Sequence, residues 1–149
     1  MTIKTSDPVA RALREHGLRR TPQRLAIARA VAGNDRHPTV QDVHAMVRDD
    51  FPTMSLATVY NTLRSLVSAG VIADLPFAGG ARFDSDPSPH INLVCSDCGS
   101  IVDAHEYDPM LTRLTRSVSS RPDFRVDGHR FDFYGRCASC ARDTAKPAP

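Results

Sequence analysis

Residues 55–83, SLATVYNTLRSLVSAGVIADLPFAGGARF, decide the N-terminal part of the fold. Ser55 is a favourable N-cap residue, and apolar residues then recur at helical spacing until Gly70. Residues 71–75 and 81–83 predict two short strands around a glycine-rich turn. A helix that is followed at once by a small hairpin is typical of the second half of a winged helix-turn-helix.

Three shorter helices are predicted before this stretch. The first covers residues 8–17 and ends at Gly17, and the second begins after the N-cap Thr21 and runs through residue 32. The third begins at Thr39 and is stopped by Phe51-Pro52. The apolar faces expected to pack in the core are Val40, Val43, Met46 and Val47 of the third helix, and Leu56, Val59, Leu63 and Leu66 of the fourth.

A second domain is predicted beyond the turn-forming segment DSDPSP at residues 84–89, which we interpret as a hinge. The division is therefore a DNA-binding winged-helix domain at residues 1–83 and a second domain at residues 90–149. The second domain is expected to contain strands at residues 91–94, 101–103, 124–126 and 129–134, a helix at 109–119, and a disordered tail, ARDTAKPAP, at 141–149.

Composition excludes some classes of protein. No run of 18 apolar residues exists, and the N-terminal segment has no continuous apolar stretch, so we expect no membrane partner and a cytoplasmic location. Residues 1–36 carry eight Lys or Arg against three Asp or Glu, whereas residues 81–149 carry nine basic and ten acidic residues. This asymmetry suggests nucleic acid at the N-terminal end, although a solvated charged helix would give the same pattern.

All four cysteines fall in two pairs, Cys95-x2-Cys98 and Cys137-x2-Cys140. Two-residue spacing lets both thiolates of a pair face one cation, and four thiolates complete a tetrahedral Zn²⁺ site. The alternatives are a redox pair, which normally occurs singly at a strand-to-helix turn, and buried unreactive thiols. We predict a closed structural zinc site that ties the start of the second domain to its end.

A second set of candidate metal ligands surrounds the hinge: His37, Asp84, His90, Asn92 and Asp103. His90 and Asn92 share one strand face because residues i and i+2 point the same way. Imidazole combined with carboxylate or amide oxygen suits Fe²⁺, Mn²⁺ or Zn²⁺. Taken singly, each residue is more often an ordinary one, and spacing alone does not join residues from two domains.

The chain resembles the ferric uptake regulator family of bacterial metalloregulators. The segments that carry the resemblance cover nearly the whole chain and are LRRTPQRLAI, HPTVQDVH, SLATVYNTLRSLVSAGVI, RFD, HINLVCSDCGSIVD and YGRCASC. The resemblance implies an α+β fold, with an N-terminal winged helix-turn-helix, a C-terminal α/β dimerisation domain, and a homodimer that represses transcription when loaded with metal. Within the family, the chain is most similar to the peroxide-sensing branch.

That branch holds a regulatory Fe²⁺ or Mn²⁺ with histidine and aspartate ligands. The resemblance assigns these roles to His37, Asp84, His90 and Asp103. The usual His-x-His of the family is His90-Ile91-Asn92 in this chain, so a weaker oxygen donor stands in place of one imidazole. In the peroxide-sensing interpretation, oxidation of His37 or His90 releases the metal-held conformation.

The helix that begins after Ser55 is expected to enter the major groove of an AT-rich palindromic operator. The predicted DNA contacts are Thr58, Tyr60, Asn61 and Arg64 to the groove, with Arg20 and Arg24 to phosphates. Tyr60 can contact a thymine methyl, although a half-buried surface aromatic is an equal alternative from the residue alone.

Two other functions compete with this interpretation. One is a manganese- or iron-responsive regulator of metal uptake, with the same fold and no peroxide chemistry. The other is a small metal-dependent hydrolase that uses His90 and Asp103. The chain has no general-base motif to support it, and the helix-turn-helix argues against it, so we expect no enzyme.

Overall fold

The computed structural model describes residues 7–77 and 79–143. The chain divides into two compact units between Pro87 and Ser88, a point that lies inside the expected 84–89 segment. Among the described residues, no helix combines the length and apolar character needed to cross a membrane.

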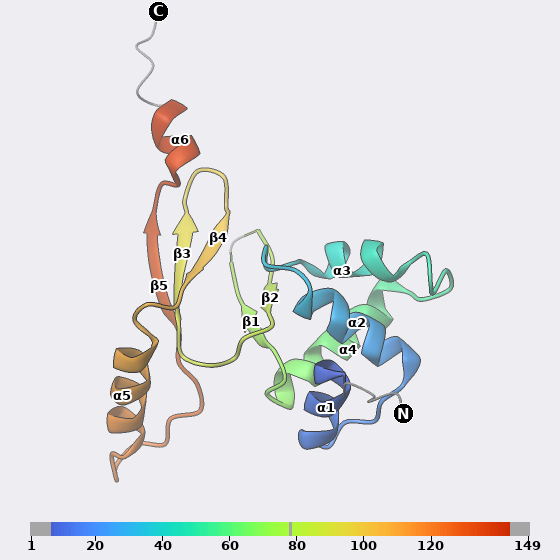
Figure 1. Ribbon diagram of the computed structural model, residues 1–149, viewed down its shortest axis with the longest axis horizontal. Coiled ribbons are helices and arrows are strands. Elements are labelled where there is room, and N and C mark those ends of the chain that lie inside the picture. Colours follow the sequence, from blue (N-terminus) through green and yellow to red (C-terminus); the bar gives the residue numbers. More distant parts are fainter. Residues whose placement is uncertain (1–6, 78, 144–149) are drawn as a thin grey trace, which may run out of the picture. The chain divides into compact units, whose positions relative to one another are not determined.

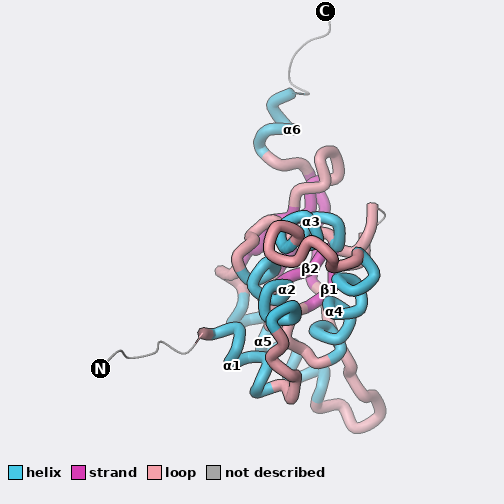
Figure 2. Tube along the Cα trace, turned by 90° about the vertical axis from the view of Figure 1, so that its right-hand side faces the viewer, coloured by secondary structure: helices cyan, strands magenta, loops and turns pink. Residues whose placement is uncertain are grey.

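The described residues of the first unit form four helices and a two-stranded hairpin (Figure 1). The elements are α1 (Pro8–Glu15), α2 (Pro22–Ala32), α3 (Val40–Val47), α4 (Leu56–Ser68), β1 (Ala73–Leu75) and β2 (Arg82–Asp84). In Figure 1 the hairpin lies at one side of the group of helices α1–α4, and Figure 2 shows the chain turned by 90°. The predicted order of helices and wing is confirmed.

Side-chain caps explain where the helices begin. The hydroxyl of Thr21 accepts from the backbone N–H of Arg24 at 3.2 Å, and that of Ser55 accepts from Thr58 at 3.1 Å. Thr39 and Asp42 form a reciprocal capping box at the start of α3. Each cap satisfies a backbone donor that has no partner inside its helix, which fixes the first turn. The predicted starts of α2, α3 and α4 are thus confirmed.

The core of the first unit is formed by one face of each helix together with the hairpin. Its fully buried side chains include Leu13, Ile27, Val31, Val43, Val59, Leu63, Leu66 and Phe83. The prediction of burial in the core is wrong for two residues of the apolar faces: Met46 is 45% exposed and Leu56 is 42% exposed. Helix α3 also ends at Val47, before the predicted stop at Phe51-Pro52.

The wing is shifted along the sequence relative to the prediction. Residues 71–72 do not join the strand, because the N–H of Val71 donates to the carbonyl of Leu66 and completes the end of α4. Strand β2 runs one residue further than expected, so Asp84 is paired with Ala73. Asp84, the first residue of the segment that we interpret as a hinge, is therefore held in the sheet.

In the second unit, residues 88–143 form a three-stranded sheet with two helices. Its elements are β3 (Ile91–Cys95), β4 (Ile101–Ala104), α5 (Asp108–Ser119), β5 (Phe131–Gly135) and α6 (Ala138–Asp143). The strand order is β4-β3-β5, with β4 antiparallel and β5 parallel to the central β3 (Figure 1). Leu111 of α5 packs with Ile91 and Ala104 in a small core.

Three predictions for the second unit are wrong in detail. Residues 124–126 form no strand, and β5 begins at Phe131 and not at residue 129. Phe124 is 64% exposed, so little of its side chain is buried by packing that would favour a strand. Residues 141–143 of the expected disordered tail belong to α6, while residues 144–149 lie outside the described residues.

Candidate functional site

The four cysteine sulfurs form one cluster. Their Sγ atoms all lie within 4.8 Å of one another, and Cys98 Sγ is 3.8 Å from Cys137 Sγ. Tetrahedral Zn²⁺ with Zn–S bonds of about 2.3 Å requires sulfurs separated by about 3.8 Å. The residues therefore fit a four-thiolate zinc ion, as the sequence predicts.

The parallel pairing of β3 and β5 explains this cluster. Parallel strands end at the same edge of a sheet, and Cys95, the last residue of β3, is paired with Gly135, the last residue of β5. Each cysteine pair follows directly from one of these strand ends. The first pair closes in a turn with Gly99 at φ 72°, a value that favours glycine. The second pair lies at the start of α6, so its two cysteines are joined by a helical turn and not by a second tight turn of this kind.

The thiol pKa values differ across the cluster. Backbone N–H groups of Cys137 and Cys98 donate to the Cys95 sulfur and lower the pKa of that thiol to about 6. The neighbouring sulfurs of Cys137 and Cys98 raise the pKa of the Cys140 thiol to about 12. Backbone donors thus favour the first thiolate, whereas hydrogen bonds to the neighbouring sulfurs favour the protonated form of Cys140. A bound cation favours the thiolate form of all four ligands, which is the requirement of a metal site.

His37 and Asp84 lie side by side in the first unit. A bridge pairs Thr39 with Arg82 in antiparallel register, and the N–H of Phe83 donates to the Pro38 carbonyl at 3.0 Å. Two residues further along this register, His37 faces Asp84. Its Nε2 is 3.6 Å from Asp84 Oδ2, and both side chains are buried.

The backbone at His37 is also unusual. Its φ of 54° lies in the left-handed region, which costs a non-glycine residue about 1–3 kcal/mol. Such strain persists where surrounding structure or a function requires one side-chain position. The sequence gives no signal of it beyond the position of His37 before Pro38.

His90, Asn92 and Asp103 lie together in the second unit. Asn92 is the register partner of Asp103, and His90 Nε2 is 3.6 Å from Asp103 Oδ1. The His90 Nδ1 lies 2.9 Å from the carbonyl of Ser88, so Nδ1 carries the proton and Nε2 is the ring nitrogen able to bind a cation. His90 and Asn92 are both buried. Imidazole, carboxylate and amide oxygen on one sheet face are a donor set that suits a divalent cation.

One residue of this sheet face, Asp132, is not among the predicted site residues. Asp132 of β5 is the register partner of Asn92 on the opposite side from Asp103, and it accepts from the Asn92 amide at 3.1 Å. The alternation of polar residues along 130–134 indicates that Asp132 lies on a polar strand face. Only the parallel pairing of β5 with β3 shows that this face is the one that carries Asn92.

The exposed face of α4 carries the predicted groove contacts. Tyr60 is 47% exposed, and Asn61 and Arg64 are also exposed. Thr58 is half-buried, and its hydroxyl lies 2.9 Å from that of Ser55 in the helix cap. Leu56, which was expected in the core, lies one turn before Tyr60 and is exposed.

The two predicted phosphate contacts differ in their surroundings. Arg20 is exposed, whereas Arg24 is half-buried and its guanidinium donates to the Arg19 carbonyl at 2.9 Å. Of the two, Arg20 has the more accessible side chain.

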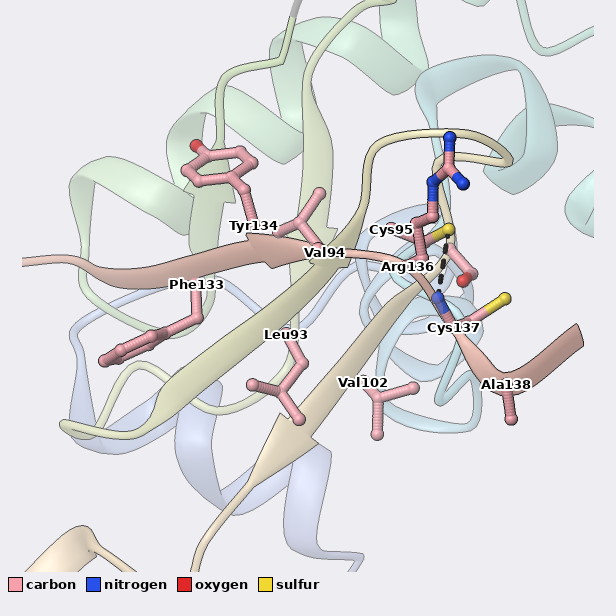
Figure 3. Close-up of a pocket in the computed structure, with 11 residues that line it drawn as sticks. Leu93, Val94, Cys95, Val102, Phe133, Tyr134, Arg136, Cys137 and Ala138 are labelled. Atoms are coloured by element: carbon pink, nitrogen blue, oxygen red, sulfur yellow. Dashed lines mark hydrogen bonds between the residues drawn. The ribbon is translucent and has the colours of Figure 1, made fainter. Parts of the chain in front are cut away.

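One face of the second unit's sheet is apolar, and it is exposed at the end nearer the cysteines, beyond the part that α5 covers at Ile91. Leu93, Val102 and Phe133 are cross-strand partners that point to the same side of the sheet, and Val94 and Tyr134 point to the other (Figure 3). Phe133 is 61% exposed and Val102 is 58% exposed. They line a pocket of about 430 Å³ beside the cysteine cluster. Adjacent exposed apolar side chains of this size are typical of an interface.

Comparison with known proteins identifies the family to which the chain is similar. Residues 15–134 match the sequence pattern of the ferric uptake regulator family. The chain is 37% identical over 129 residues to the peroxide-responsive repressor PerR of Staphylococcus saprophyticus and 38% identical over 129 residues to that of Staphylococcus aureus. Each alignment covers 86% of both chains. The solved structure of the Campylobacter jejuni peroxide stress regulator aligns with a TM-score of 0.68 at 26% identity, over 90% of this chain and 100% of that one.

Proposed function

The chain belongs to the ferric uptake regulator family, and we propose that it is a metal-dependent transcriptional repressor. In this proposal it binds operator DNA as a homodimer and senses peroxide. The observation that carries the proposal is the presence of two buried histidine–carboxylate pairs, His37 with Asp84 and His90 with Asp103. Buried groups of this kind are costly unless they bind a cation or one another. The family consists of transcriptional regulators, which disfavours the hydrolase alternative.

Two metals have different roles in this proposal. A zinc ion on Cys95, Cys98, Cys137 and Cys140 stabilises the second unit, since four thiolates leave no open position. A regulatory Fe²⁺ or Mn²⁺ is bound jointly by His37, Asp84, His90, Asn92 and Asp103, as the family resemblance implies.

Ligands from two units allow the regulatory metal to act as a switch. A cation bound to both units favours one angle between them, and thereby one spacing of the two α4 helices in a dimer. Only one spacing matches two half-sites about one helical turn apart on DNA. The metal therefore shifts a population of dimers toward the form that binds the operator. The open apolar face with Leu93, Val102 and Phe133 is a suitable surface for the dimer contact.

The DNA contact is assigned to α4, with an AT-rich palindrome as the expected operator. Tyr60 offers an exposed aromatic ring to a thymine methyl, and Arg64 can donate to guanine or phosphate. The test is binding of such a duplex by the metal-loaded and the metal-free protein. Binding that does not depend on Fe²⁺ or Mn²⁺ would contradict the proposal.

Tyr60→Ala is expected to weaken operator binding by about 1–3 kcal/mol, because it removes a base-edge contact. The residue is exposed, so metal content and thermal stability should not change. Fluorescence anisotropy with a labelled duplex measures the effect, and Tyr60→Phe, which keeps the ring, is the matched control. Normal binding by Tyr60→Ala would show that the groove-facing surface lies elsewhere.

A second candidate function is a manganese- or iron-responsive regulator of metal uptake. One observation favours it: Asn92 offers an amide oxygen where the family usually has imidazole. An oxygen donor is a better ligand for Mn²⁺ than for metals that prefer nitrogen donors. If the protein binds Mn²⁺ in the cell, peroxide would not oxidise its histidines.

Asn92→His is expected to tighten regulatory metal binding on the order of tenfold, about 1.4 kcal/mol, since imidazole is the stronger donor. The gain should be larger for Fe²⁺ than for Mn²⁺. Competition titrations under anaerobic conditions measure both affinities, with Asn92→Ala as the variant that should weaken them. Equal affinities in Asn92→His and the unmodified chain would mean that residue 92 is no ligand.

A further inference from the structure

The side chain of Asn92 is held from one side by Asp132. The two residues are register partners on the parallel strands β3 and β5, so their side chains lie on the same sheet face. The amide Nδ2 of Asn92 donates to Asp132 Oδ1 at 3.1 Å. This bond fixes which end of the Asn92 amide faces β5.

Asp132 is itself held firmly. Its second oxygen, Oδ2, accepts from the Arg130 guanidinium at 2.5 Å and from the Tyr134 hydroxyl at 3.2 Å. The Asp132 side chain is 11% exposed. Both carboxylate oxygens are therefore engaged, and the charge of Arg130 balances that of Asp132. This arrangement makes Asp132 an acceptor for Asn92 and leaves it poorly suited to bind a cation itself.

The Asn92 carbonyl oxygen is consequently directed away from β5. It is buried, and no hydrogen-bond donor reaches it from residues 7–77 or 79–143. On that side Asn92 faces Asp103, its partner on β4, and His90 is two residues earlier on the same strand face. A flipped amide would place its oxygen against the Asp132 carboxylate, where two acceptors repel.

We propose that Asp132 is a positioning residue that turns the Asn92 amide so that its carbonyl oxygen becomes a ligand of the regulatory cation beside His90 and Asp103. The inference rests on the proposed function, because it assumes that a divalent cation binds these residues. It assigns an outer hydrogen-bond partner to the one ligand that departs from the family pattern. Such partners orient metal ligands and alter affinity by about 10–100-fold.

The first experiment is a double-mutant cycle read as Mn²⁺ affinity. Asn92→Ala, Asp132→Ala and the double variant are titrated with Mn²⁺, and the free ion is measured by electron paramagnetic resonance. Each single change should weaken binding about tenfold or more. The double variant should be no weaker than Asn92→Ala, because Asp132 acts through Asn92. Asp127→Ala, in an exposed ion pair with Arg125, is the matched control for loss of a carboxylate.

Two results would overturn the proposal. One is an unchanged Mn²⁺ affinity in Asp132→Ala. The other is a full additional loss in the double variant, which would show that Asp132 acts through its charge or the fold. Zinc content and circular dichroism identify a variant that has unfolded.

A second measurement needs no regulatory metal. The side-chain amide of Asn92 should give a nitrogen–proton resonance pair in the metal-free protein that is shifted by the bond to Asp132. Asp132→Ala should move it to the position of an ordinary amide, and Asp127→Ala should not. If this shift is seen but Mn²⁺ does not bind the unmodified protein, the proposed function fails while the orientation of Asn92 stands. If Mn²⁺ binds but the amide resonance is the same in both proteins, the positioning role is wrong.

Discussion

Cys98→Ser is expected to lose the structural zinc and to unfold the second unit. A four-thiolate zinc site contributes roughly 10–16 kcal/mol of folding free energy, which equals or exceeds the total stability of about 5–15 kcal/mol of an ordinary domain. One buried apolar cluster of this unit joins Ile91, Ala104 and Leu111, with Phe131 half-buried against it, and Val94 and Ile101 are buried nearer the cysteine end of the sheet. Such a core cannot compensate for the lost metal.

Metal analysis should find about one zinc per unmodified chain and none in Cys98→Ser. Sedimentation should show loss of the dimer, since the proposed dimer surface belongs to the same unit. The first unit has its own core, so much of the helical circular dichroism should remain. Ser96→Ala, an exposed change between the same two cysteines, is the matched control. A zinc-free Cys98→Ser protein that remains a folded dimer would refute the structural role of the metal.

Dilute peroxide is expected to abolish operator binding by the Fe²⁺-loaded dimer and to leave the Mn²⁺-loaded dimer bound. A bound Fe²⁺ would supply the redox chemistry that cleaves the peroxide O–O bond. One imidazole C–H of His37 or His90 would become a ring C–OH at the expense of H₂O₂, the second oxygen would leave as water, and the iron would undergo no net change. The oxidised ring would be a poorer nitrogen donor, so the metal-held conformation would be released.

Mass spectrometry should find the added oxygen on the peptide that carries His37 or His90. His16, exposed at the end of α1, serves as an internal control and should stay unmodified, as should the four cysteines. If the Fe²⁺ form stays on DNA with both histidines intact, the protein regulates metal supply and does not sense peroxide.

Local signals in the sequence predicted the first unit well. The starts of α2, α3 and α4 are set by Thr21, Thr39 and Ser55, whose caps involve residues only three positions away. Leu56 was misplaced because helical spacing describes a face but does not say how far along it the core extends. Leu56 lies in the first turn of α4, and there the apolar face of the helix extends beyond the core into solvent.

The second unit depended on contacts between distant residues. Residues 124–126 have an apolar pattern, but they are not paired with either edge strand of the β4-β3-β5 sheet. Helix α6 was missed because the composition of the tail resembles a disordered segment, whereas Cys137 and Cys140 place its first turn against the cysteine cluster. The cysteine spacing alone predicted the zinc cluster, since two matched pairs have few other uses. The pairing of Asn92 with Asp132 needed the parallel register, which no local pattern contains.

The parallel pairing of β3 and β5 has a consequence for the rate of folding. Two parallel neighbouring strands require a long crossover connection, which here contains β4 and α5. Such non-local pairing forms slowly, because the chain loses the entropy of closing this loop before it gains any contact between the strands. A zinc ion already bound to Cys95 and Cys98 can bind Cys137 and Cys140 as soon as β5 pairs with β3, and this stabilises the newly formed pair of strands. We therefore expect the second unit to refold faster at higher free zinc concentration. Faster refolding shortens the time during which the apolar sheet face is exposed and aggregation competes with folding.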